Sequence, residues 1–97
     1  MSDQYQYELA TSANLTLGAS SVSAAIPANT ELLAIACTGN CHFATGQGSA
    51  TATVTSPLLL VNAGVVIIRV NYGDNFIAAI QDAGSTGIFN FCKVTER

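Results

Sequence analysis

Hydrophobic and polar residues alternate along this chain in short segments that are separated by turn-forming residues. In the first segment, 4–9, Tyr5, Tyr7 and Leu9 fall on one side of an extended strand and the polar side chains fall on the other. No window of the sequence holds a sustained apolar repeat at helical spacing. Further β-type segments follow at 21–26, 31–37, 41–45, 57–61, 65–71, 76–80 and 88–95, with a polar strand or a loop at 50–55.

These segments predict an all-β protein of about seven or eight strands. Turns that contain glycine or asparagine join the strands at the spacing typical of a single antiparallel β-sandwich or a jelly-roll-like barrel. The length of 97 residues corresponds to one domain, residues 1–97. Residues 1–19 are a candidate N-terminal arm, in which 2–9 has the alternation of an edge strand that adds to a neighbouring chain.

Two segments do not alternate. Leu58-Leu59-Leu60-Val61 and Val65-Val66-Ile67-Ile68 are apolar at every position, which is typical of strands buried on both faces. Either loops of the chain itself or a neighbouring subunit would cover the second face. We favour the neighbouring subunit, because a chain of this size without predicted helices has little else to use as a cover. The interface residues that we predict are Tyr5, Tyr7, Leu9, Phe89 and Phe91.

The composition also favours association with other proteins. Hydrophobic residues make up 49% of the chain and charged residues 9%, whereas typical soluble domains are about 25% charged, and the mean hydropathy is +0.41. The most apolar stretch, Pro57–Val70, is shorter than the roughly 20 residues of a membrane-spanning helix and is interrupted by Asn62 and Gly64. The N-terminus lacks the basic and apolar regions of a secretory signal. We therefore expect cytoplasmic synthesis, no membrane partner, and burial of apolar surface against protein.

The charge distribution disfavours nucleic acid as a partner. The net charge is −3, and the basic residues Arg69, Lys93 and Arg97 are not clustered in the sequence. Binding to a phosphate backbone requires several basic side chains on one face. We expect the partners to be further copies of the chain and other protein subunits.

The most conspicuous motif is Cys37-Thr38-Gly39-Asn40-Cys41-His42. In the interpretation that we favour, Gly39 and Asn40 form a tight hairpin loop and the two cysteines are buried as small apolar residues. A Cys37–Cys41 disulfide is an alternative, although permanent disulfides are uncommon in a reducing compartment. Zinc ligation by the motif together with Cys92 is opposed by the adjacency of Cys41 and His42, which places them on opposite faces of a strand. A c-type haem needs two residues between the cysteines, and here there are three.

Catalytic and ligand-binding roles receive little support from the sequence. His42 is the single histidine available to a Cys–His pair, and no third orienting group accompanies it. The carboxylates are scattered, and Asp74 and Asp82 lie where turn formers are common. We therefore predict a non-enzymatic protein without a catalytic, cofactor or metal site. The aromatic residues Tyr5, Tyr7, Phe43 and Tyr72 could stack on a sugar, but packing is their more common role.

Three stretches, in their order along the chain, resemble small β-sandwich structural proteins of tailed bacteriophages. They are Ala25-Ile26-Pro27-Ala28-Asn29-Thr30, then Ser56-Pro57-Leu58-Leu59-Leu60 with Ala63-Gly64-Val65, and finally Gly84-Ser85-Thr86-Gly87 with Val94-Thr95-Glu96. The resemblance implies a virion component, namely a capsid decoration or cement protein. We expect such a protein to form a homotrimer on the capsid surface, bound to the major capsid protein or other virion subunits. The alternative is a neck, tail or fibre component, including a module that binds host carbohydrate.

Overall fold

The computed structural model describes residues 7–9 and 12–96, which form β-strands and one short 3-10 helix. Within these residues no helix is long and apolar enough to cross a membrane. The elements are β1 (Tyr7–Leu9), β2 (Ala13–Leu17), β3 (Val22–Ala25), β4 (Leu32–Cys37), β5 (Cys41–Gly46), β6 (Leu58–Leu59), η1 (Val61–Ala63), β7 (Val66–Arg69), β8 (Phe76–Gln81) and β9 (Gly87–Glu96).

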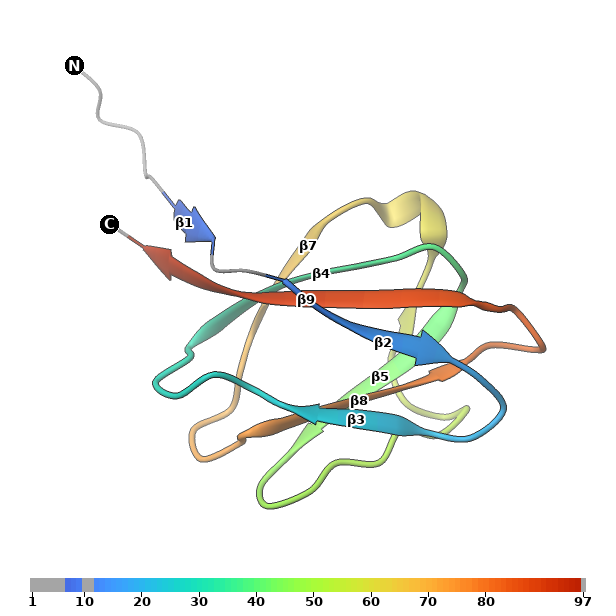
Figure 1. The fold of residues 1–97 in the computed structure, drawn as a ribbon, viewed down its shortest axis with the longest axis horizontal. Coiled ribbons are helices and arrows are strands. Elements are labelled where there is room, and N and C mark those ends of the chain that lie inside the picture. Colours follow the sequence, from blue (N-terminus) through green and yellow to red (C-terminus); the bar gives the residue numbers. More distant parts are fainter. Residues whose placement is uncertain (1–6, 10–11, 97) are drawn as a thin grey trace.

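The strands form two antiparallel sheets that pack face to face as a sandwich (Figure 1). Sheet A has the order β9–β4–β7, and β1 and β2 pair one after the other with the free side of β9. Sheet B has the order β3–β8–β5–β6. The pairs β2–β9, β3–β8, β4–β7 and β5–β6 are nested from the outermost to the innermost, which is the strand arrangement of a jelly roll. The predicted sandwich is therefore confirmed, and the two sheets do not close into a barrel.

The N-terminal part of the described chain belongs to sheet A. Leu15 and Leu17 of β2 are buried while the residues between and before them are exposed, so this segment is a half-solvated strand. β1 pairs with β9 of the same chain, with Leu9 opposite Val94. The described residues of 1–19 thus pair within their own chain, and the N-terminal arm stays a prediction. Residues 50–55, which were predicted as a strand or a loop, lie in a loop.

The core lies between the inner faces of the two sheets. Phe89 and Phe91 of β9 are 0% and 2% exposed, and the ring of Phe89 stacks against Phe43 of β5 with the ring centroids 6.3 Å apart. Full burial of such a side chain stabilises the fold by about 1.5–3 kcal/mol. The rings of Phe89 and Phe91 thus fill the chain's own core, which corrects the prediction that they face a partner.

A long loop covers the middle of the outer face of sheet B. The loop between β5 and β6, residues 47–57, places Ala52 in a buried position, where the Ala52 N–H donates to Ser21 Oγ at 2.9 Å. Ala78 lies on the outer face of β8, because its neighbours Ile77 and Ala79 belong to the core, and yet it is fully buried. The chain therefore covers the outer side of β8 itself, whereas the outer side of β6 stays exposed at Leu58.

The outer face of sheet A is built from small and apolar side chains. Leu33 and Ile35 of β4 point into the core, so Leu32, Ala34 and Ala36 lie on the outer face. On the adjacent β9, Cys92 is opposite Ala34 and is half-buried. β4, a central strand of sheet A, therefore carries apolar side chains on both of its faces.

Candidate assembly surface

Exposed apolar side chains gather in one short segment, 58–67, which contains β6, η1 and the first half of β7. In the rest of the described chain, Val54 and Tyr72 are the only exposed large hydrophobic residues. Within the segment 58–67, five large apolar residues are between 43% and 68% exposed. We call these five residues the apolar edge, and they are Leu58, Leu60, Val61, Val65 and Ile67.

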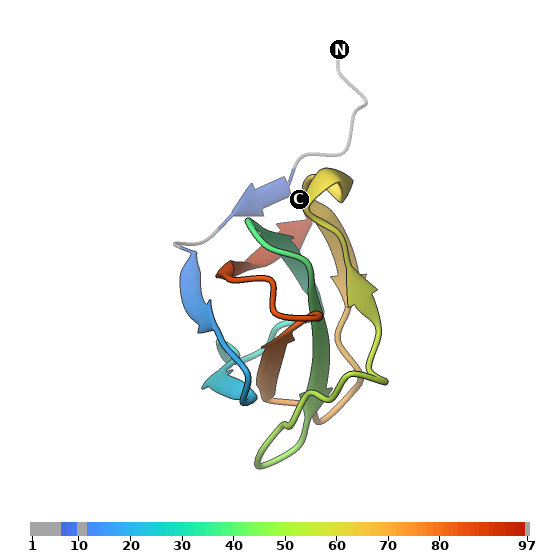
Figure 2. The same cartoon turned by 90° about the vertical axis from the view of Figure 1, so that its right-hand side faces the viewer.

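The apolar edge runs along one side of the sandwich, where the chain crosses from sheet B to sheet A. Figure 2 shows β6, η1 and β7 together on that side. β6 pairs only with β5, and β7 pairs only with β4, so each is the last strand of its sheet among the described residues. An edge strand leaves backbone N–H and C=O groups unpaired, and such groups can pair with another chain. This side of the molecule therefore combines apolar side chains with open strand edges.

Leu59 attaches the apolar edge to the core. Leu59 is 4% exposed and belongs to the core cluster, whereas Leu58 on one side of it and Leu60 on the other are exposed. The period-two alternation of a strand is present here, but leucine occupies both faces. The segment is apolar on both faces in the sequence, but the chain covers only the face that carries Leu59.

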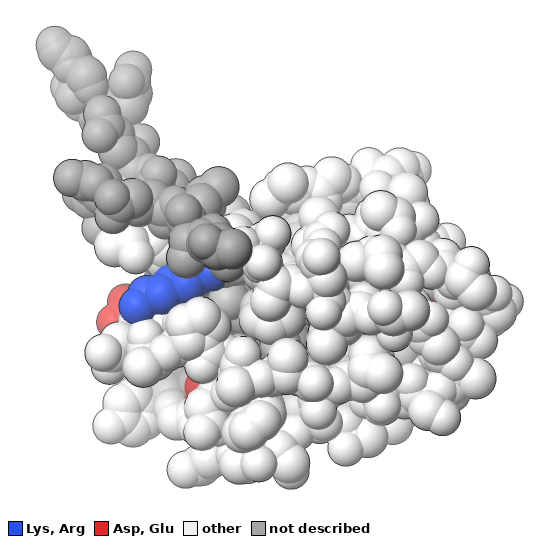
Figure 3. All heavy atoms as spheres, viewed as in Figure 1, with Lys and Arg blue, Asp and Glu red and all other residues white. Residues whose placement is uncertain are grey.

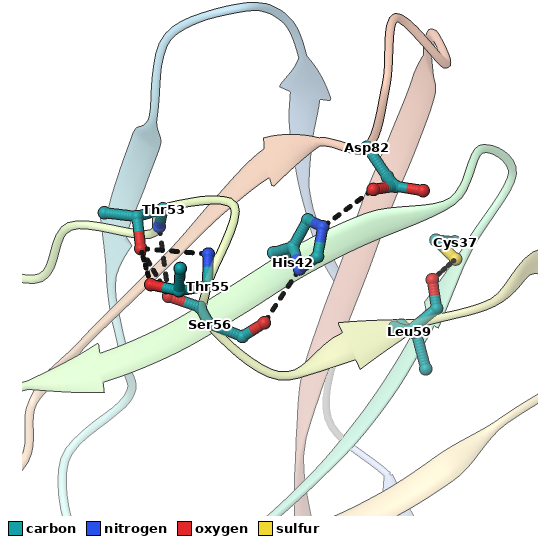
Figure 4. A network of polar contacts seen from close by, with 7 residues as sticks. All are labelled: Cys37, His42, Thr53, Thr55, Ser56, Leu59 and Asp82. Carbon is teal, nitrogen blue, oxygen red and sulfur yellow. Dashed lines mark hydrogen bonds and ion pairs between the residues drawn. The ribbon is translucent and has the colours of Figure 1, made fainter.

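Three residues of the Cys37–His42 motif hold the backbone of the segment 56–61, and Figure 4 shows two of them, Cys37 and His42. His42 Nδ1 lies 2.7 Å from the carbonyl oxygen of Ser56, and the Cys37 thiol donates to the carbonyl oxygen of Leu59 at 3.7 Å. Asn40 Oδ1 accepts a hydrogen bond from the Val61 N–H at 2.9 Å. The motif therefore fixes the position of the apolar edge against the sandwich, a role that the sequence did not indicate.

His42 joins the same segment to the turn between β8 and β9. Its second ring nitrogen, Nε2, lies 2.8 Å from Asp82 Oδ1, and the residue is 7% exposed. Both ring nitrogens face oxygen acceptors, so only the imidazolium form can donate a hydrogen bond to each. The bond to the Ser56 carbonyl and the bond to the Asp82 carboxylate raise the pKa of His42, against the effect of burial. Asp82 is a turn residue, as predicted, and also the ion-pair partner of His42.

The connection between β4 and β5 is not the predicted hairpin loop. β4 pairs with β7 and β9 in sheet A, whereas β5 pairs with β6 and β8 in sheet B, so Thr38–Asn40 crosses between the sheets. A Cβ atom added at Gly39 would lie 2.1 Å from the Thr86 carbonyl oxygen, which shows how closely the crossing packs against the β8–β9 turn. Only glycine fits this crossing without displacing the backbone.

The cysteines of the motif are free and buried, as predicted. Burial raises the pKa of Cys41 to about 12, and the neighbouring Cys37 adds to the increase. Such a thiol is not ionised at neutral pH and is a poor nucleophile. Cys41 faces the core, and His42 lies on the opposite face of β5, as strand alternation predicts. In the described part of the chain no group of three or more His, Cys, Asp or Glu residues is placed to hold a metal ion.

The geometry around His42 also differs from that of a catalytic triad. The ring contacts the carbonyl oxygen of Ser56 and not its hydroxyl, which accepts a hydrogen bond from the Thr53 N–H. Among residues 7–9 and 12–96 the ring thus has no nucleophilic side chain as a partner, and its two nitrogens already face the Ser56 carbonyl oxygen and Asp82 Oδ1.

Of the predicted interface residues, Tyr5 and the side chains of Tyr7 and Leu9 lie outside the described residues. The apolar edge contains none of the five residues that we predicted for the interface. One signal for it was present, because 58–61 and 65–68 are two-sided apolar segments in the sequence.

No protein-family model matches the chain, and comparison with curated proteins and with solved structures gives no significant match.

Proposed function

We propose that this protein is a non-enzymatic virion structural protein of a tailed bacteriophage, which acts as a capsid decoration or cement protein. In this proposal three copies form a closed ring, and the ring binds the major capsid protein and ties neighbouring capsid subunits together. The observation that carries the proposal is the apolar edge, because it is an exposed surface whose composition is typical of a protein interface.

The chemistry of the apolar edge supports contact with protein. The segment 58–67 contains no charged residue, so its burial leaves no unpaired charge at an interface. Interface centres are depleted in charged residues in the same way. Burial of apolar area contributes about 25 cal/mol per Å², and a standard interface covers about 800 Å² of each partner. A neighbouring copy packed along β6, η1 and β7 would cover the side chains and also the open strand edges.

Closed rings are a common means of satisfying such a surface. If the apolar edge of one copy packs against the next copy, rotation by a third of a turn closes the assembly after three copies. A closed trimer leaves no apolar edge unmatched, which prevents open-ended aggregation. The trimer then offers further surfaces to the capsid.

The test compares two valines of nearly equal exposure. Val65 lies on the apolar edge and is 68% exposed, and Val54 lies in the β5–β6 loop and is 65% exposed. We expect the wild-type protein and Val54→Lys to be trimers by light scattering after size exclusion. Val65→Lys should be a folded monomer, because a lysine at the contact would bury an unpaired charge.

Binding to virion parts completes the test. Wild-type protein and Val54→Lys should bind purified capsids that lack the protein and raise the temperature at which these capsids break open. Val65→Lys should bind weakly. Binding to isolated necks or tails instead of capsids would overturn the decoration role, and a wild-type monomer that binds neither would overturn the assembly proposal as a whole.

A further inference from the structure

An open cleft lies between the β3–β4 loop and the β7–β8 loop, at the end of β7 that is remote from η1. Its volume is about 730 Å³, within the range of about 300–1,000 Å³ that is usual for small-molecule sites. The buried side chains of Ile26 and Val70 lie among its lining residues. The polar and aromatic side chains that line it include Asn29, Glu31, Gln47, Arg69, Asn71 and Tyr72.

The two loops that form the cleft are tied together by backbone hydrogen bonds. The Ile26 N–H donates to the Asn75 carbonyl oxygen at 2.8 Å, and the Val70 N–H donates to the Glu31 carbonyl oxygen at 2.9 Å. Thr45 Oγ1 donates to Asp74 Oδ2 at 2.7 Å, which fixes the second loop to β5. These hydrogen bonds hold the two walls of the cleft in place.

The polar side chains of the cleft are unused by the part of the chain that the structure describes. Within that part, no hydrogen bond or ion pair involves the side chains of the polar and aromatic lining residues, namely Asn29, Glu31, Gln47, Arg69, Asn71 and Tyr72. Amides, carboxylates and guanidinium groups each present two or more hydrogen-bonding atoms in one plane. Such groups can hold pairs of neighbouring hydroxyl groups on a ligand.

Tyr72 adds an aromatic surface to these groups. Its side chain is 105% exposed, so its ring makes no packing contact within the described structure. Asn71 and Asp74 form the turn that carries it, through a hydrogen bond from the Asp74 N–H to the Asn71 carbonyl oxygen at 3.0 Å. The turn fixes the backbone that carries the ring, so stacking of a flat apolar ligand face on it costs only the freedom of the Tyr72 side chain.

Charge distinguishes this end of the molecule from the apolar edge. Glu31, Arg69, Asp74 and Lys93 all line the cleft or the smaller hollow beside it. On the face shown in Figure 3, charged side chains of the described residues appear only at this end. Charges of both signs are present in the cleft itself, so a ligand with hydroxyl groups and no net charge matches it better than an anion.

We propose that this cleft binds a neutral saccharide, with a sugar ring stacked on Tyr72 and its hydroxyl groups bonded to Glu31, Asn71 and Gln47. Saccharides combine an apolar face of C–H groups with a rim of hydroxyl groups, and the cleft offers an aromatic ring beside planar polar groups. The site is separate from the apolar edge, so the inference does not depend on the proposed role in the capsid.

The test uses the full-length chain and named sugars. Saturation-transfer NMR is measured with the methyl glycosides of glucose, galactose, mannose and N-acetylglucosamine, and with sialyllactose as an acidic comparison. We expect at least one neutral glycoside to bind and to shift the amide signals of residues 27–31 and 69–75. Tyr72→Ala should weaken its binding by about tenfold, whereas Tyr72→Phe, which keeps the ring, should bind as the wild type does.

Two controls separate this site from the assembly surface. Val65→Lys should bind the sugar normally even if it no longer forms trimers, and Tyr72→Ala should form trimers normally. The absence of binding by every neutral glycoside, or binding that Tyr72→Ala leaves unchanged, would overturn the proposal. Loss of capsid binding in Tyr72→Ala without any sugar binding would instead make Tyr72 a protein contact, and would also overturn it.

Discussion

The buried ring of His42 couples stability to pH. Its nitrogens lie 2.7 Å from the Ser56 carbonyl oxygen and 2.8 Å from Asp82 Oδ1, so the charged ring satisfies both acceptors and the neutral ring only one. The pKa of His42 is therefore raised in the folded state above its ordinary value of 6.5. The stabilisation is complete below that ordinary value and is lost as the pH rises through the higher pKa of the folded protein.

We predict that the free energy of unfolding falls between pH 5.5 and pH 8.5, as His42 loses its proton in the folded protein. Urea unfolding at a series of pH values measures this change. In Asp82→Asn the charged partner is absent, so the pH dependence should become smaller. A wild-type stability that does not change with pH, or an equal slope in Asp82→Asn, would contradict the assignment of a charged His42.

Gly39 lies at a position where the backbone leaves no room for a Cβ atom. A Cβ atom there would lie 2.1 Å from the carbonyl oxygen and 2.8 Å from the carbonyl carbon of Thr86, and both are backbone atoms that cannot rotate away. We predict that Gly39→Ala destabilises the protein by about 1–3 kcal/mol in thermal unfolding. The matched control is Gly18→Ala, where no atom lies within 4 Å of the new Cβ and the effect should be small. Equal effects of the two substitutions would show that the crossing is not tightly packed.

Single residues could be predicted from the sequence where strand alternation alone decides their position. The opposite orientation of Cys41 and His42 and the burial of Cys37 and Cys41 followed from the pattern. The partners of His42 could not be predicted from this pattern, because Ser56 and Asp82 are 14 and 40 residues away along the chain. Contacts over such separations depend on the strand order, which a single sequence does not contain.

At the scale of elements, the two-residue strand β6 connects the core to the apolar edge. Leu59 is buried, and its neighbour Leu58 is half exposed on the outside. We predict that Leu59→Ala lowers the free energy of unfolding of the monomer by about 2–5 kcal/mol, because it leaves a cavity in the core. Leu58→Ala should leave monomer unfolding nearly unchanged and weaken the trimer.

Chemical unfolding at low protein concentration measures the first effect, and sedimentation equilibrium measures the second. The two substitutions remove the same side chain at adjacent positions, so their comparison isolates the direction in which each residue points. A large loss of monomer stability in Leu58→Ala would show that the outer side of β6 packs within the chain, and the apolar edge would then be misassigned.

The elements that sequence analysis missed share a physical cause. β2 has the ordinary alternation of a half-solvated strand, but its pairing with β9 joins residues that are at least 70 positions apart, as in the register of Ala13 with Phe91. The crossing Thr38–Asn40 has the length and the glycine of a hairpin loop, and local sequence does not distinguish the two. In both cases a distant partner strand determines the structure.

At the scale of the whole molecule, the sandwich covers its two outer faces differently. The loop 47–57 covers the middle of the outer face of sheet B, whereas the apolar edge, which begins in β6 of that sheet, remains exposed. The number of strands and their antiparallel packing followed from alternation and turn residues. The location of the exposed surface did not, because exposure depends on where a loop lies across a sheet.

Deletion of residues 2–9 distinguishes assembly through the N-terminal segment from assembly through the apolar edge. If the segment 2–9 adds a strand to a neighbour, its deletion should abolish the trimer. If the apolar edge forms the contact, deletion of residues 2–9 should leave both the fold and the trimer intact, because β1 pairs with only three residues at the end of β9 and β2 occupies the rest of that side. We predict the second outcome, with circular dichroism to report the fold and light scattering to report the mass. A folded monomer after this deletion would assign assembly to the N-terminal segment. In that case Val65→Lys should remain a trimer. The two variants together therefore determine which surface joins the copies.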